Sequence, residues 1–222
     1  MKVGIIGAGT MGAGIAQAFA RTQKYEVLLC DLNRELAEKG RNKIADTLRH
    51  REEKGKISSR EVCEIMENIT PGTIEDCCDC GLVIEAAIED MGVKKQTFRK
   101  LQDICGDSCI LATNTSSLSI TEIGAGLKKP VVGMHFFNPA PVMKLVEIIT
   151  GIDTPAETVQ ILKTIAEDIG KVPVQVKETA GFVVNRILIP MINEGIGLYA
   201  EDTANAEDID TAMRLGTNHP MG

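Results

Sequence analysis

The stretch KVGIIGAGTMGAGIAQAFAR (residues 2–21) determines the fold class of the chain. Its first five residues predict a short buried β-strand, and its last nine predict a helix. The G-x-G-x-x-G turn between them is typical of a dinucleotide site. Gly7 permits the tight turn, Gly9 lets a pyrophosphate approach the backbone, and Gly12 lets the helix pack against the strand. The helix N-terminus supplies N–H groups to phosphate. The cofactor-binding candidates of this turn are Gly7, Gly9, Thr10, Met11 and Gly12.

An acidic residue follows where a dinucleotide site needs one. A second strand is expected at residues 25–30, and Asp31 comes directly after it. This lies about twenty residues past the glycines, where a carboxylate binds the adenosine ribose and disfavours the 2′-phosphate of NADP. The sequence therefore predicts NAD rather than NADP. Arg34 lies close by and keeps NADP open as an alternative, and Asp31 is also explained as part of a helix cap.

Polar residues mark the ends of two further apolar strands, expected at residues 81–86 and 109–113. Glu89 follows the first strand, and Ser116 follows the second. Open α/β sheets bind their ligands beyond the carboxyl ends of the strands, so we expect both side chains to face the crevice. The alternative for the serine-rich segment is a plain cap for the helix that begins at Ile120.

A hairpin is predicted in VVGMHFFNPAPVMKLVEII (residues 131–149). His135 and Glu147 are each six residues from Pro141, so a hairpin centred there makes them a cross-strand pair. A slip of one residue breaks that pairing. A carboxylate beside a histidine fixes its tautomer and raises its basicity, as a general base requires. The two apolar runs of this hairpin are residues 131–137 and 142–149.

For an isolated pair of this kind, a structural role is the competing explanation, with His135 satisfied in the core and Glu147 solvated. The other motifs change that balance. These are the glycine turn with Asp31, the strand end at Ser116 and a polar Asn185 in an apolar helical turn, which is either functional or a buried hydrogen-bonder. Taken together they favour a catalytic role for the histidine.

The organisation of the chain changes after residue 178. Before this point, strands and helices alternate, which predicts a doubly wound Rossmann-type α/β sheet closed by the hairpin. Afterwards only helices are expected, and Asn205 with Asp208 three residues later marks the start of the last one. We predict a dinucleotide-binding domain at 1–178 and the start of an all-helical second domain at 179–222. That part is too short to enclose a core, so we expect a truncated chain or a partner.

Composition limits the classes of partner. The net charge is −7 and the pI is about 5.1, which argues against nucleic acid and membrane surfaces as partners. No apolar segment reaches membrane-spanning length, and the first strand follows Met1-Lys2 directly, which leaves no room for a signal peptide. We therefore expect a cytoplasmic protein whose seven cysteines are mostly free thiols. The Cys77-x-x-Cys80 pair is a weak candidate for a metal or redox site.

One basic stretch stands out in this acidic chain. Residues 39–60 contain eight Lys or Arg residues and three acids. Such a stretch attracts a polyphosphate ligand, although a solvated helix face explains it equally well. The basic residues are Lys39, Arg41, Lys43, Arg49, Arg51, Lys54, Lys56 and Arg60.

Four motifs in one order carry a resemblance to a known family: GAGTMGAGIAQAFA, NTSSLSI, HFFNPAPVMKLVEII and GFVVNRILIPMINE. The chain resembles the short-chain L-3-hydroxyacyl-CoA dehydrogenases, and within them the bacterial 3-hydroxybutyryl-CoA dehydrogenases. The resemblance covers essentially the whole chain. It implies that an L-3-hydroxyacyl-CoA is oxidised with NAD, or acetoacetyl-CoA reduced with NADH. It also implies a homodimer or a higher homo-oligomer for the full-length form, because the family's helical domain extends beyond NHPMG.

The resemblance also assigns roles by position. It implies that His135 is the catalytic base and that Glu147 orients it. Ser116 and Asn185 match residues that hold the 3-oxygen of the substrate. The matched dinucleotide contacts are Asp31, Glu89, Lys94, Ser116 and Asn138, and the weaker matches near the CoA phosphates are Lys54 and Thr47.

The sequence is also compatible with two other functions. One is a related NAD-dependent hydroxy-acid dehydrogenase that acts on a substrate without CoA. The other is a non-catalytic dinucleotide-binding fragment, because the helical part is short. Turnover of a CoA ester distinguishes the first alternative, and NADH binding without turnover identifies the second.

Overall fold

The computed structural model describes residues 1–220. The chain divides into two compact units, Met1–Ala180 and Gly181–Gly222. The first unit is built on one eight-stranded sheet, in the order β3-β2-β1-β4-β5-β6-β7-β8. Neighbouring strands are parallel except β6 and β7. The strands are β1 Lys2–Ile6, β2 Glu26–Cys30, β3 Ile69–Gly72, β4 Leu82–Glu85, β5 Ile110–Thr113, β6 Val131–Phe136, β7 Leu145–Thr150 and β8 Val172–Lys177.

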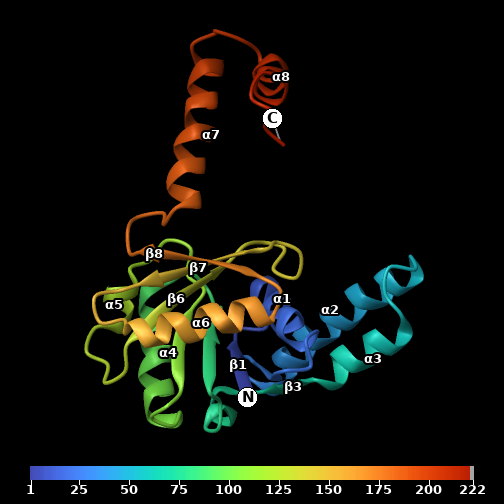
Figure 1. Cartoon of the computed structure of the whole chain (residues 1–222), viewed down its shortest axis with the longest axis vertical. Helices are drawn as coiled ribbons and strands as arrows, with labels where there is room; N and C mark the ends of the chain where they lie inside the picture. The colour runs from blue at the N-terminus through green and yellow to red at the C-terminus, as the bar shows by residue number, and fades with distance from the viewer. Residues whose placement is uncertain (221–222) are drawn as a thin grey trace. The chain divides into compact units, whose positions relative to one another are not determined.

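Helices cover both faces of this sheet: α6 contributes to the apolar cluster on one face, and α5 lies against Gly133 on the other. Figure 1 shows how the helices are arranged around the strands. Asn33 caps the long helix α2 by accepting a hydrogen bond from the Leu36 N–H, and Ser58 starts α3 with a capping box. α2 and α3 run side by side away from the sheet. The helical segments are α1 Thr10–Ala20, α2 Arg34–Glu53, α3 Ser59–Glu67, the 3₁₀ turn η1 Ile74–Cys77, α4 Met91–Ile104, α5 Ile120–Gly124 and α6 Ala156–Asp168.

Alternation along the strands divides the side chains between two faces. The main apolar cluster includes Ile5 of β1, Phe19 of α1 and Leu162 of α6, so it lies on one face. The alternate residues along each strand point to the opposite face of the sheet. There, a Cβ atom added to Gly133 would lie 3.2 Å from Ile120 of α5, which places α5 on this second face.

The order of the strands reverses between β1 and β4. The chain adds β2 and β3 on one side of β1, then returns to add β4 and the later strands on the other. In a doubly wound sheet the ligand binds beyond the carboxyl ends of the strands at this switch point. Gly7 follows β1 there, and Ala86 follows β4. The Rossmann-type α/β sheet predicted from the sequence is confirmed.

The hairpin of β6 and β7 pairs His135 directly with Glu147, as the symmetric spacing about Pro141 predicted. The predicted limits of the two runs were wrong. β6 ends at Phe136, and β7 begins at Leu145, three residues later than the apolar run at 142. The intervening residues form a turn instead, in which the N–H groups of residues 142 and 143 both donate to the Pro139 carbonyl, at 2.9 and 3.0 Å.

The second unit contains two helices among its described residues, α7 Val184–Ala200 and α8 Ala206–Gly216. Asn205 caps α8, because its side chain accepts a hydrogen bond of 2.9 Å from the Asp208 N–H. Neither helix buries any of its residues. A helical segment that follows the sheet is confirmed, although α7 begins three residues after the predicted start at 181.

Candidate active site

The glycine turn leaves an open space in front of α1. Gly7 has a φ of +100°, and a Cβ atom on it would lie 2.8 Å from the Ala86 carbonyl oxygen. A Cβ atom on Gly12 would lie 1.7 Å from the Gly7 carbonyl oxygen. A Cβ atom on Gly9 would meet nothing within 4 Å. Two glycines thus permit close packing, and the third faces the space at the helix N-terminus that a pyrophosphate requires.

A pocket of about 420 Å³ extends from this turn to Asp31 and α2. The two carboxylate oxygens of Asp31 accept hydrogen bonds from the N–H groups of Ala8 at 2.7 Å and Leu32 at 2.8 Å. These bonds fix the carboxylate at the end of β2 and leave it on the wall of the pocket. The residues around it therefore fit the adenosine half of a dinucleotide. The pocket is lined by Ala8, Gly9, Asp31, Leu36, Lys39, Gly40, Asn42, Lys43 and Asp46.

Arg34, which left NADP open as an alternative, is held by another acidic side chain. Its Nη2 atom lies 3.2 and 3.1 Å from the two carboxylate oxygens of Asp76 in η1. The same carboxylate accepts a 2.9 Å hydrogen bond from the Thr73 N–H, and these contacts lower the pKa of Asp76. Arg34 is therefore already paired in the structure, and it is not among the residues that line the pocket, whereas Asp31 is.

His135 and Glu147 form a buried pair at the carboxyl end of β6. His135 Nδ1 lies 2.8 Å from Glu147 Oε2, and the two residues are 5% and 1% exposed. A carboxylate only accepts hydrogen bonds, so with Glu147 ionised Nδ1 carries the hydrogen of this bond and Nε2 is the second ring nitrogen. The ring of Phe137 lies against the imidazole, with ring centres 4.5 Å apart. The pair has the geometry of an oriented general acid/base.

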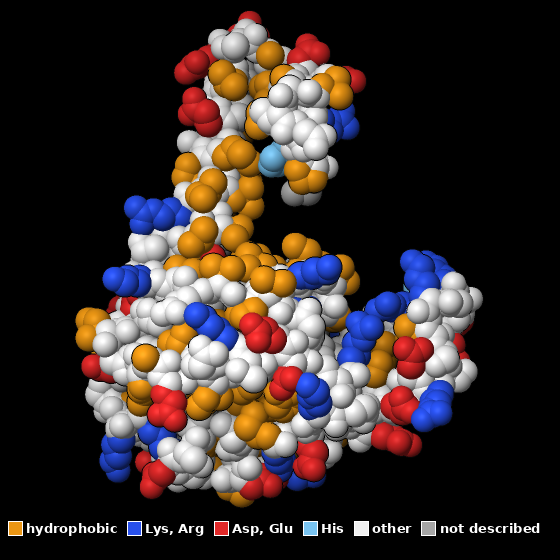
Figure 2. All heavy atoms as spheres, in the orientation of Figure 1, with side chains coloured by type: hydrophobic (Ala, Val, Ile, Leu, Met, Phe, Trp, Pro, Cys, Tyr) orange, Lys and Arg blue, Asp and Glu red, His pale blue; other side chains and the backbone are white. Residues whose placement is uncertain are grey.

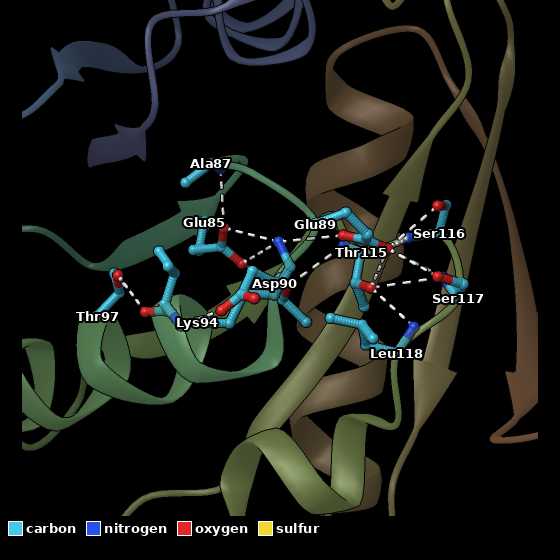
Figure 3. Close-up of polar contacts among 12 residues, drawn as sticks. Glu85, Ala87, Glu89, Asp90, Lys94, Thr97, Thr115, Ser116, Ser117 and Leu118 are labelled. Atoms are coloured by element: carbon cyan, nitrogen blue, oxygen red, sulfur yellow. Dashed lines mark hydrogen bonds and ion pairs between the residues drawn. The ribbon is translucent and has the colours of Figure 1, made fainter.

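Ser116 lies in a loop that is tied both to Glu89 and to β6. Glu89 Oε1 accepts hydrogen bonds from the Ser116 N–H at 2.8 Å, from Ser116 Oγ at 3.1 Å and from Thr115 Oγ1 at 2.6 Å (Figure 3). At the start of the loop, Asn114 Oδ1 accepts a 2.9 Å hydrogen bond from the Phe136 N–H. The hydrogen bond between Asn114 and Phe136 attaches the loop to the residue next to His135. The serine and the histidine are thus on adjacent strand ends.

The same contacts determine the charge of Glu89. Partial burial alone raises the pKa of this carboxyl, but hydrogen bonds from Thr115 and Ser116 and the nearby Lys94 ammonium outweigh it. The resulting pKa of Glu89 is about 2. The group is therefore a carboxylate at neutral pH, and it acts only as a hydrogen-bond acceptor for the loop.

Lys94 is buried rather than directed to solvent. It is 1% exposed, and its Nζ atom lies 2.8 and 2.9 Å from the two oxygens of Glu85 and 3.3 Å from Glu89 Oε2 (Figure 3). In this arrangement, the lysine ammonium contacts Glu89 Oε2 while it is itself bound to Glu85. Its predicted direct contact with the dinucleotide stays a prediction.

Asn138 belongs to the turn between β6 and β7, and a buried lysine fixes that turn. Lys171 Nζ donates hydrogen bonds to the carbonyl oxygens of Ala140 at 2.6 Å and Met143 at 2.8 Å. Burial lowers the pKa of Lys171. The sequence interpretation missed this residue. The only available signal was a lysine at the start of an apolar strand, and that pattern does not indicate which carbonyl groups it meets.

The two predicted CoA-binding residues lie on or next to α2. Thr47 and Lys54 are exposed and seven residues apart, so they are on one side of the helix, about two turns from each other. Figure 2 shows Lys and Arg side chains gathered over the α2–α3 region. Several of them are paired with acids on the same helix, such as Lys39 with Glu35 at 2.8 Å. The positive charge that this region presents at its surface is therefore smaller than the sequence of residues 39–60 alone indicates.

Asn185 lies in the first turn of α7, in the second unit.

Among residues 1–220 there is no group of three His, Cys, Asp or Glu residues that could hold a metal ion. The cysteines Cys77 and Cys80 are buried free thiols. Within the same residues, no helix has the length and apolar character needed to cross a membrane.

Comparison with known proteins shows two family models in succession. The NAD binding domain of 3-hydroxyacyl-CoA dehydrogenase matches residues 2–179, and the C-terminal domain of the same family matches residues 181–222. A 3-hydroxybutyryl-CoA dehydrogenase of Clostridioides difficile is 48% identical over 225 residues, which are 100% of this chain and 80% of the relative. A probable 3-hydroxybutyryl-CoA dehydrogenase of Bacillus subtilis is 46% identical, over 100% of this chain and 78% of the relative.

The crystal structure of (S)-3-hydroxybutyryl-CoA dehydrogenase from Ralstonia eutropha superposes with a TM-score of 0.95 at 41% identity. The match covers 100% of this chain and 79% of that one. The cofactor is NAD, because the family model that matches residues 2–179 is an NAD binding domain and the open dinucleotide turn fits it. The chain belongs to the NAD-dependent 3-hydroxyacyl-CoA dehydrogenase family.

Proposed function

We propose that this dehydrogenase interconverts L-3-hydroxybutyryl-CoA and acetoacetyl-CoA, with His135 as general acid/base and Glu147 as the residue that orients it. The observation that carries the mechanism is the buried 2.8 Å contact between His135 Nδ1 and Glu147 Oε2. It lies at the carboxyl end of β6, on the edge of the sheet where the glycine turn and Glu89 also lie. The substrate is supported by the relatives, several of which are 3-hydroxybutyryl-CoA dehydrogenases.

In the oxidative direction, His135 Nε2 removes the proton of the 3-hydroxyl group. NAD supplies the hydride acceptor for carbon 3. The imidazolium that forms keeps its Nδ1–H bond to the Glu147 carboxylate, which stabilises the positive charge in a buried site. In the reductive direction, the imidazolium returns its proton to the 3-oxygen. Glu147 therefore favours the protonated imidazole and holds the ring in one orientation in both directions.

Ser116 is proposed to contact the 3-oxygen of the substrate in addition to His135. Its loop is fixed by Glu89 and by the hydrogen bond between Asn114 and Phe136. Asn185 stays a substrate-binding candidate on the resemblance of its motif. Asp31 and the glycine turn bind the cofactor, and Thr47 and Lys54 on and beside α2 are proposed for the CoA phosphates.

The assay that separates a CoA substrate from a free hydroxy acid is NADH oxidation with acetoacetyl-CoA and, in parallel, with acetoacetate. We expect kcat/KM to be about 100-fold or more higher for the CoA ester, because binding of the remote CoA part is used at the reacting carbon. NADPH in place of NADH serves as the cofactor control. Equal rates with the free acid would contradict the proposed substrate class. NADH binding without turnover of either substrate would contradict the proposed enzyme.

We also propose a cytoplasmic homo-oligomer. The helices of the second unit expose Ile187, Ile189 and Ile196 and bury no residue, and apolar helix faces of this kind are typical of association surfaces. All seven cysteines are free thiols, which suits a reducing compartment. Light scattering of the purified protein tests the first point, because a monomer at micromolar concentration contradicts it. Cell fractionation tests the second, and recovery outside the cytoplasmic fraction contradicts it.

A further inference from the structure

A carboxylate with no assigned role lies at the end of β4. Glu85 is wholly buried, at 0% exposure, and its two oxygens accept four hydrogen bonds. Two come from Lys94 Nζ, one comes from the Ala87 N–H at 2.8 Å, and one comes from Thr113 Oγ1 at 2.7 Å. Every donor belongs to a segment that leads to the active site. A buried carboxylate with this many partners is held in one position.

Lys94 connects the fixed Glu85 carboxylate to Glu89. Its ammonium has three hydrogens, and its neighbours supply three acceptor oxygens, two from Glu85 and one from Glu89. Because the Glu85 contacts are at 2.8 and 2.9 Å and the Glu89 contact is at 3.3 Å, the lysine is bound mainly to Glu85. Glu89 Oε2 faces the lysine, and Oε1 is left for the loop (Figure 3).

Glu89 Oε1 in turn receives five hydrogen bonds from residues 115–117, three of them from hydroxyl groups. If Glu85 lost its charge, Glu89 would become the only carboxylate beside a buried ammonium. The lysine would then move towards Glu89 and compete with the loop for its oxygens, because a buried charge without compensation is costly. The position of Ser116 therefore depends on the charge of a residue that it does not touch.

We propose that Glu85 is a positioning residue of the reaction, which holds Ser116 in place through Lys94 and Glu89. The inference rests on the proposed role of Ser116 at the 3-oxygen. It adds a buried carboxylate on β4 to the residues on which turnover depends, and it gives Thr113 a part as the hydroxyl donor to this carboxylate.

The test is a double-mutant cycle in the purified full chain with acetoacetyl-CoA and NADH. Glu85→Gln is expected to lower kcat about tenfold or more, because a displacement of a positioning group by about 1 Å costs up to about 100-fold. In a Ser116→Ala background, the same change is expected to lower kcat less than about twofold, since the hydroxyl group that it positions is gone. A residue with only a structural role would give independent losses that multiply.

Two further variants keep the test decisive. Thr113→Val removes the hydroxyl donor to Glu85 and the 3.2 Å acceptor of the Thr115 N–H, and it leaves every charge in place. It serves where Glu85→Gln folds poorly, and we expect a loss of kcat that also disappears in the Ser116→Ala background. Glu122→Gln is the matched control. Glu122 pairs at 2.9 Å with Lys95, the neighbour of Lys94, but at the surface. We expect this variant to keep the wild-type kcat.

The outcomes separate the inference from the proposed function. Slow turnover of Ser116→Ala combined with wild-type kcat in Glu85→Gln and Thr113→Val would overturn the role of Glu85 alone. Losses that multiply in the double variants would do the same. Wild-type turnover of Ser116→Ala itself would contradict the proposed role of that serine and, with it, the inference.

Discussion

His135→Gln is expected to lower kcat for acetoacetyl-CoA reduction by a factor of about 10²–10⁴, the range that a positioned general acid contributes. Glutamine keeps a polar group within reach of Glu147, so the buried carboxylate is not left without a donor. It cannot carry the proton that the imidazole exchanges. The affinity for NADH, followed by its fluorescence, is expected to stay close to the wild-type value, because the glycine turn and Asp31 are unchanged.

The chain offers a matched control for this variant. His50 lies on α2, exposed, with its Nδ1 atom 3.5 Å from a Glu53 carboxylate oxygen. It is therefore also a histidine beside a glutamate, but away from the sheet. His50→Gln is expected to leave kcat unchanged. Turnover of His135→Gln within about twofold of the wild type would show that another group transfers the proton.

Gly9→Ala is expected to raise the Kd for NADH about tenfold or more, which corresponds to about 1.4 kcal/mol of binding free energy. The added methyl group meets no protein atom within 4 Å, and the φ of −71° at this position suits alanine. The variant should therefore fold as well as the wild type. The methyl group would occupy the space in front of α1 through which the pyrophosphate reaches the backbone N–H groups.

Substitutions of two other glycines serve as comparisons for this result. A Cβ atom on Gly106 also meets nothing within 4 Å, but this residue precedes β5 at the opposite edge of the sheet, so Gly106→Ala should bind NADH normally. Gly12→Ala would place a methyl group 1.7 Å from the Gly7 carbonyl oxygen. We expect it to lower the thermal unfolding midpoint as well as NADH binding. Wild-type affinity in Gly9→Ala would contradict the position of the dinucleotide.

The features that the sequence predicted well are those with a fixed local geometry. Side chains alternate along strands, and an antiparallel turn pairs residues that are equally far from its centre. For this reason, the spacing of His135 and Glu147 about Pro141 was enough to predict their pairing. The G-x-G-x-x-G turn was readable because each glycine has a separate steric requirement.

The features that the sequence did not reveal depend on where distant segments meet. Glu85 and Lys94 were visible as a polar residue at a strand end and a lysine near a helix start, but their burial together follows only from the packing of α4 against β4. The same holds for Lys171, which donates to carbonyl groups some thirty residues away. The start of β7 was misplaced because Val142 and Met143 are apolar but lie in the turn, where they are exposed.

The central claim is that the chain transfers a hydride between the nicotinamide cofactor and carbon 3 of a CoA ester. The direct measurement uses NADH that carries deuterium at the transferable position of C4, with acetoacetyl-CoA as substrate and mass spectrometry of the product. We expect one deuterium at C3 of 3-hydroxybutyryl-CoA for each NADH oxidised by the wild type, and almost none with His135→Gln at the same protein concentration. Oxidation of the cofactor without deuterium at C3, or no oxidation by the wild-type protein, would contradict the account.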